Sequence, residues 1–101
     1  MSTLAIRLKQ ARLRAGLSQE QLGIDAGLDP ASASARMNRY ELGKRAPDLA
    51  LVEKLADVLG VPAPFFYAAD NEIAELLIAF SALSKTKQAQ VIELVRALER
   101  Q

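Results

Sequence analysis

The composition of this chain excludes most catalytic and redox chemistry. Its 101 residues, 50% of them hydrophobic and 25% charged, suit one soluble globular domain with a short appendix. Cys and His are both absent, which excludes disulfides, thiolate zinc sites, Cys nucleophiles and His bases. The net charge is +1, but residues 1–45 carry eight Lys and Arg against four Asp and Glu, whereas residues 46–101 carry five against eight. This asymmetry suggests that the first half faces a polyanion.

Spacing and capping residues mark the first two predicted helices. Apolar residues recur at helical spacing over residues 4–15, and Gly16 provides a left-handed C-cap. Ser18 is expected to cap a short second helix, about residues 19–26. In this capping box the Ser18 hydroxyl accepts from the Gln21 amide, and the Gln21 side chain reaches back.

The pair Asp29-Pro30 predicts the start of a third helix. Asp is a good N-cap, and Pro fits the first helical position because its missing N–H would be unpaired there anyway. We therefore expect a helix over residues 30–42, with Gly43 at its end. Its inward face consists of three apolar side chains, Ala33, Met37 and Tyr40.

A basic loop over residues 44–47 separates this helix from the next. Asp48 is expected to cap a fourth helix over residues 49–59, which Gly60 ends. Its inward side chains are predicted to be Leu51, Val52, Leu55, Ala56 and Leu59. A short fifth helix around residues 63–67 then closes the core of a first domain with Phe65, Phe66 and Tyr67.

Two further amphipathic segments follow a joint at residues 68–70, and Ser84 is expected to cap the second of them. We predict an all-α fold in which residues 1–68 form a five-helix domain and residues 69–101 form a two-helix hairpin. This hairpin could pack back on the domain, but its apolar stripes favour a homodimer interface. The expected interface residues are Ile73, Leu76, Leu77, Phe80, Val91, Leu94, Val95 and Leu98.

The stretch from Ser18 to Gly43 carries the functional signal. A short capped helix, a Gly-containing turn and a second helix rich in small polar and basic side chains form a helix-turn-helix pattern. Arg can make two hydrogen bonds to guanine, and Asn can do the same with adenine. The outward face of the second helix therefore has the chemistry to read major-groove edges, although periodicity alone also allows a merely solvated face.

Several short motifs recur here in the order typical of one family. They are Arg7-Leu8-Lys9, Arg12, Gly16-Leu17-Ser18-Gln19-Glu20-Gln21-Leu22, Ala26-Gly27-Leu28, Tyr40-Glu41-Leu42-Gly43-Lys44-Arg45-Ala46-Pro47, Leu55-Ala56-Asp57-Val58-Leu59-Gly60-Val61 and Phe65-Phe66. With these residues the chain resembles the lambda-repressor-like helix-turn-helix regulators of the Xre or Cro/C1 type. The resemblance covers about residues 4–67 and implies a five-helix DNA-binding domain.

The resemblance also implies roles for individual residues. Arg12 and Glu41 match a structural ion pair between the first and third helices. Contacts to DNA phosphate, which position the protein without reading sequence, fall on Ser18, Gln19, Lys44 and Arg45.

The chain departs from the family pattern between the turn glycine and Glu41, where about four residues, near one helical turn, are in excess. We expect the recognition helix to be longer by one turn at its start; a longer turn between the helices is the alternative. Counting back from Glu41 places the base-reading positions at Ser34, Ala35, Asn38 and Arg39, with Arg36 nearby. Counting forward from Gly27 places them near Ala31 and Ser32.

These observations predict a cytoplasmic, nucleoid-associated transcriptional regulator that binds an inverted repeat in double-stranded DNA as a homodimer. The alternative is an antitoxin that binds a partner toxin as well as its own operator. An enzyme is disfavoured, because no nucleophile elbow or phosphate-cradling glycine loop is present. No cofactor, metal or membrane partner is predicted.

Overall fold

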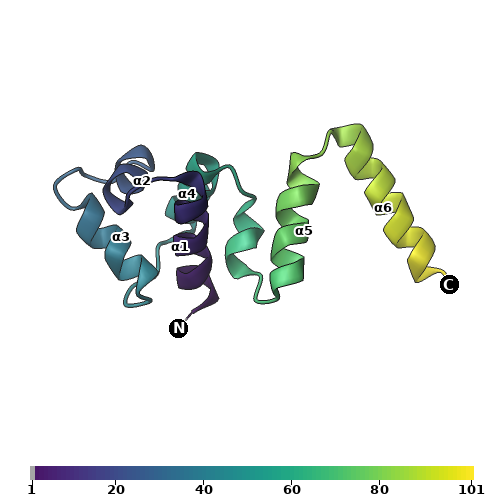
Figure 1. The fold of residues 1–101 in the computed structure, drawn as a ribbon, viewed down its shortest axis with the longest axis horizontal. Coiled ribbons are helices and arrows are strands. Elements are labelled where there is room, and N and C mark those ends of the chain that lie inside the picture. The colour runs from purple at the N-terminus through teal and green to yellow at the C-terminus, as the bar shows by residue number, and fades with distance from the viewer. Residues whose placement is uncertain (1) are drawn as a thin grey trace.

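The computed structural model describes residues 2–101, and within that range the chain is all-helical, as predicted. Figure 1 shows a body of packed helices from which the C-terminal helix extends away. The six α-helices and one 3-10 helix are α1 (Thr3–Ala15), α2 (Gln19–Asp25), α3 (Ala33–Glu41), α4 (Leu49–Leu59), η1 (Ala63–Tyr67), α5 (Asn71–Ala82) and α6 (Lys85–Glu99).

The body of α1 to η1 encloses one hydrophobic core, to which each helix contributes. Burying one large apolar side chain completely contributes about 1.5–3 kcal/mol, so these residues are the main source of stability. The predicted inward faces of α3 and α4 are confirmed, except that Leu59 is only half-buried. The largest fully buried side chains are Leu8, Leu22, Met37, Val52, Leu55, Phe65 and Phe66.

Tyr67 does not close the core as predicted, because its side chain is 56% exposed. The short helix η1 inserts Phe65 and Phe66, whose rings meet edge to face with centroids 5.8 Å apart. These two rings fill the space beneath η1. Tyr67 instead lines an open apolar groove with Leu49 and Ile73.

Three predicted N-caps are confirmed. The Ser18 hydroxyl accepts from the Gln21 amide at 3.0 Å, Asp48 caps α4 at 2.8 Å, and Ser84 caps α6 at 3.2 Å. The second half of the capping box is wrong, since the Gln21 side chain does not reach back. It donates to the Asp25 carboxylate at 2.7 Å, because a charged acceptor one turn ahead forms a stronger hydrogen bond than a neutral one.

The predicted start of the third helix is also wrong, because α3 begins at Ala33 and not at Pro30. The Asp29 carboxylate accepts from the Ala31 amide at 2.9 Å, and the Ser32 amide donates to the Asp29 carbonyl at 3.0 Å. These bonds stabilise a tight turn instead of the first turn of a helix. The excess residues therefore lengthen the turn between α2 and α3, which was the alternative interpretation.

Packing against α2 explains why α3 begins where it does. A Cβ atom placed on Gly23 would lie 2.9 Å from the Cβ of Ala33 and 3.0 Å from the Cγ of Met37. Glycine in the middle of α2 thus lets the two helices approach closely, and Ala33 and Met37 are both fully buried there. This contact fixes the register of α3 in the body.

Arg7 fastens the joint between the body and α5. Its guanidinium donates to the carbonyls of Ala68 and Ala69 at 2.9 and 3.2 Å and to Asn71 Oδ1 at 3.0 Å. It also lies over the Phe65 ring, 5.7 Å from the centroid. The start of α5 is therefore held to α1 and η1, and Ala74 joins the core.

The last helix, α6, has no buried residue. It diverges from α5 and points away from the body (Figure 1). The radius of gyration is 15.5 Å, whereas a compact domain of about 100 residues has about 13 Å. Across residues 2–101, no helix combines the length and apolar character needed to cross a membrane.

Candidate nucleic-acid interface

The helix α3 is buried on one side and exposed on the other, and the exposed side is its outward face. Ala33, Met37 and Tyr40 anchor it in the core. Four of the side chains predicted to read bases are exposed, and all four project from the same side of the helix: Ser34, Ala35, Asn38 and Arg39.

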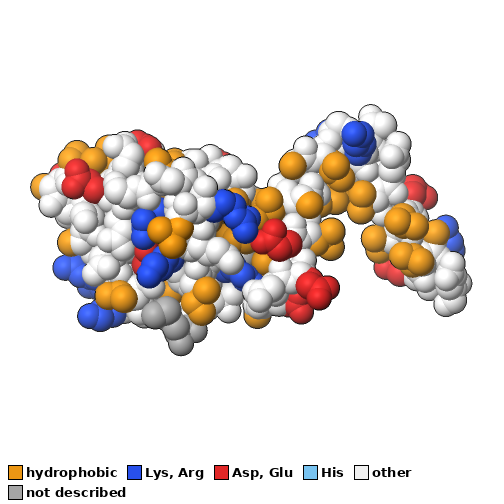
Figure 2. All heavy atoms as spheres, viewed as in Figure 1, with side chains coloured by type: hydrophobic (Ala, Val, Ile, Leu, Met, Phe, Trp, Pro, Cys, Tyr) orange, Lys and Arg blue, Asp and Glu red, His pale blue; other side chains and the backbone are white. Residues whose placement is uncertain are grey.

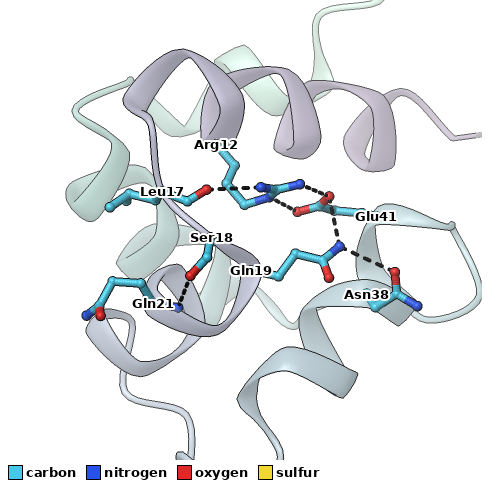
Figure 3. A network of polar contacts seen from close by, with 7 residues as sticks. All are labelled: Arg12, Leu17, Ser18, Gln19, Gln21, Asn38 and Glu41. Atoms are coloured by element: carbon cyan, nitrogen blue, oxygen red, sulfur yellow. Dashed lines mark hydrogen bonds and ion pairs between the residues drawn. The ribbon is translucent and has the colours of Figure 1, made fainter.

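An ion pair beneath this face joins α1 to α3. Arg12 Nε donates to Glu41 Oε2 at 2.6 Å, and Nη2 donates to Oε1 at 2.9 Å, while Nη1 donates to the Leu17 carbonyl at 3.0 Å (Figure 3). Glu41 is only 4% exposed. The hydrogen bond to Glu41 raises the pKa of Arg12, although burial acts in the opposite direction. Arg12 therefore stays charged, and its two hydrogen bonds to Glu41 fix the end of α3 against α1.

Gln19 links this ion pair to the outward face. Its side-chain amide donates to Glu41 Oε1 at 3.2 Å and to Asn38 Oδ1 at 3.3 Å (Figure 3). Ser18 and Gln19 also line one shallow hollow together with Ser34. The start of α2, where phosphate contacts are expected, therefore lies beside two of the expected base-reading positions.

The turn after α3 gathers basic side chains at the other end of the face. The amides of Lys44 and Arg45 donate to the Arg39 carbonyl at 3.0 and 3.4 Å, which folds this turn against the end of the helix. All three side chains are exposed. Figure 2 shows Lys and Arg side chains at the lower end of α3.

Two predicted base-reading residues do not join the outward face. Ser32 lies at the N-cap of α3, half-buried, with its hydroxyl donating to the Asp29 carbonyl at 3.4 Å. Arg36 is also half-buried and donates to the Tyr40 hydroxyl at 3.0 Å, on the side of α3 that faces the following turn.

Sequence reasoning missed an apolar groove beside this face. Ile6, Leu13 and Leu42 are 44–59% exposed and line a hollow of about 400 Å³ that also includes Gln19 and Asn38. Its signal in the sequence is a pair of large apolar residues seven apart on α1, outside the inward stripe.

Comparison with known proteins places this geometry in a family. Residues 3–64 match the family model described as a helix-turn-helix domain. This match spans more than half of the chain, so the protein belongs to the helix-turn-helix family, which confirms the resemblance at that level.

A solved structure extends the likeness to the full length. The crystal structure of transcriptional regulator BswR shares 44% sequence identity with this chain and has a TM-score of 0.82. The similarity covers 100% of this chain and 95% of that one, so it includes α5 and α6. Among curated proteins, none matches the chain.

Proposed function

We propose that this protein is a sequence-specific regulator of transcription that binds an inverted repeat in double-stranded DNA as a homodimer. The observation that carries the proposal is the outward face of α3, flanked by the start of α2 and by the basic loop at residues 44–47. Such a helix fits the major groove of B-DNA, which is about 12 Å wide. Family membership and the likeness to BswR support the same assignment.

Within this proposal, the outward face reads bases. Arg39 is suited to guanine and Asn38 to adenine, while Ala35 can contact a thymine methyl group. The hydrogen bond from Gln19 to Asn38 orients that amide before DNA arrives, which lowers the entropy lost on binding.

Phosphate contacts set the register of the helix in the groove. The Ser18 hydroxyl and the backbone amide of Gln19 serve one end of the face, since the side-chain N–H groups of Gln19 are donated to Glu41 and Asn38. Lys44 with Arg45 serves the other end. These contacts add affinity that depends on salt and not on sequence. The buried pair of Arg12 and Glu41 supports both ends, because it joins the helices that carry them.

The apolar surface of α5 and α6 supports the homodimer. Leu94, Val95 and Leu98 of α6 are 50–59% exposed, and Ile73 and Leu76 of α5 are 54% and 59% exposed. A stripe of this kind on a small protein marks an interaction surface. A second copy offers the same stripe under twofold symmetry, which would place two recognition helices about 34 Å apart on one side of the DNA.

Selection of bound fragments from random duplex DNA tests the proposal. We expect enriched sequences made of two half-sites in inverted orientation, with centres about 10 base pairs apart. Enrichment of a single half-site would contradict binding as a symmetric dimer. No enrichment over bulk competitor at moderate salt would contradict sequence-specific binding altogether.

A further inference from the structure

Three arginines converge on one cavity at the end of α3. Arg36, Arg39 and Arg45, together with Tyr40 and Ala46, line a hollow of about 280 Å³ between the helix and the turn that follows it. This is several times the roughly 30 Å³ that a water molecule occupies in the liquid. No carboxylate is among the lining residues.

The guanidinium of Arg36 is held in position by the core. It donates to the Tyr40 hydroxyl at 3.0 Å, and Tyr40 is only 8% exposed. The amide of Arg45 donates to the Arg39 carbonyl at 3.4 Å, which keeps the backbone of the turn beside the helix. Two separate elements thus bring these side chains to the same hollow.

None of the three arginines forms an ion pair with a carboxylate of residues 2–101. Three other arginines do, since Arg12, Arg14 and Arg96 each lie within 4.0 Å of an acidic partner. Like charges gathered without a counter-ion repel one another, and the repulsion is larger near a protein surface than in bulk water. The cavity therefore favours an anion, and guanidinium groups match a phosphate with paired hydrogen bonds.

We propose that Arg36 and Arg45 bind one phosphate group of the DNA backbone in this cavity. Arg36 is then a phosphate contact instead of a base reader, whereas Arg39 keeps its base-reading role. This inference rests on the proposed function. With about 100° between successive residues of a helix, Arg36 and Ser34 lie on opposite flanks of the outward face centred on Ala35 and Arg39. The start of α2 then contacts the backbone on one flank of α3, and the arginine cavity contacts it on the other.

The first test compares Arg36→Gln with Arg100→Gln, which removes the same charge from the exposed end of the chain. Binding is measured as a function of salt on the selected duplex, on its single-position variants and on an unrelated duplex. Arg36→Gln should weaken binding about tenfold on every duplex and lower the salt slope by about one. Arg100→Gln should change neither quantity. A loss confined to one operator position would make Arg36 a base reader and overturn the inference, while the proposed function would stand.

The second test locates the phosphate. Neutral methylphosphonates replace the operator phosphates one at a time, and at one position the effects of Arg36→Gln and Arg45→Gln should both disappear. Arg45 is exposed, so its variant reports on the cavity even if Arg36→Gln lowers stability. If Arg36→Gln and Arg45→Gln still weaken DNA binding with every modified duplex, the inference is overturned.

A third test separates backbone phosphate from a free anion with the same chemistry. Inorganic pyrophosphate is titrated into the protein by calorimetry. We expect only weak binding, in the millimolar range. Micromolar binding of pyrophosphate, together with unchanged DNA affinity in Arg36→Gln, would assign the cavity to a soluble ligand and overturn the inference. Absence of any preferred duplex in the first test would instead overturn the proposed function.

Discussion

Replacing Glu41 by Gln should destabilise the protein strongly, although the side chain keeps its shape. Glu41 accepts two hydrogen bonds from Arg12 and one from Gln19. The side chains of Arg12 and Glu41 are only 11% and 3% exposed. Water therefore cannot solvate the Arg12 guanidinium that loses its carboxylate partner. Breaking a buried pair by removing one partner costs about 3–5 kcal/mol. Because Gln retains an acceptor oxygen, we expect a loss of about 3 kcal/mol.

Urea unfolding followed by circular dichroism measures this loss. With a slope of about 1.5 kcal/mol/M, the midpoint should fall by about 2 M. Glu75→Gln is the matched control, since it breaks the ion pair with Arg14. In that pair the Arg14 side chain is 49% exposed and the Glu75 side chain is 60% exposed. Exposed pairs contribute about 0–1 kcal/mol, so this variant should unfold almost like the parent.

Equal destabilisation by the two substitutions would refute this reasoning. If Glu41→Gln and Glu75→Gln lower the free energy of unfolding equally, the pair with Arg12 is not a buried structural element. The pH dependence provides a second check. Because the hydrogen bond with Glu41 raises the pKa of Arg12 in the folded state, Arg12 stays charged and the contribution of the pair should persist from neutral to moderately alkaline pH.

Three further predictions concern DNA binding, assembly and the packing of α3. Arg39→Ala should weaken specific DNA binding by about 1–3 kcal/mol and relax the base preference at one operator position. Lys44→Ala should weaken binding to all duplexes alike and lower the salt slope of binding by about one. Both are measured by titrating DNA binding at several salt concentrations. Leu94→Gln should convert a dimer into a monomer in sedimentation at micromolar concentration, because it places a polar group on the exposed stripe of α6. Gly23→Val should lower the free energy of unfolding by about 1–3 kcal/mol, because a Cβ atom placed there would lie 2.9 Å from Ala33 Cβ, even before the two Val methyl groups are added.

Each of these predictions has an outcome that would contradict it. An equal loss on all sequences for Arg39→Ala would make Arg39 a backbone contact. Leu94→Gln should sediment as a monomer, whereas a control at the exposed Gln90, such as Gln90→Ser, should remain a dimer. If both variants remain dimeric, α6 is not the interface. A Gly23→Val variant as stable as the parent would mean that α2 can move away from α3 without cost.

Much of the fold follows from local rules that a single sequence carries. Ser18, Asp48 and Ser84 cap helices because their side-chain oxygens accept from amides three residues ahead, and no distant contact is needed. Periodicity identified the inward faces of α3 and α4 for the same reason. The outward positions of Asn38 and Arg39 could be predicted because they follow from those inward faces.

Tertiary packing decided what local rules leave open. Asp29-Pro30 is equally suited to a helix start and to a turn, and the contact of Ala33 with Gly23 selected the turn. Arg36 was expected to read bases, but the hydroxyl of Tyr40 holds its guanidinium on the flank of the helix. Gly23 is brought to Ala33 only by the packed chain, so the sequence around Asp29-Pro30 holds no signal of this contact. Tyr40 lies one helical turn after Arg36 and is therefore a local partner, but its hydroxyl has a fixed place only because the ring is buried in the core.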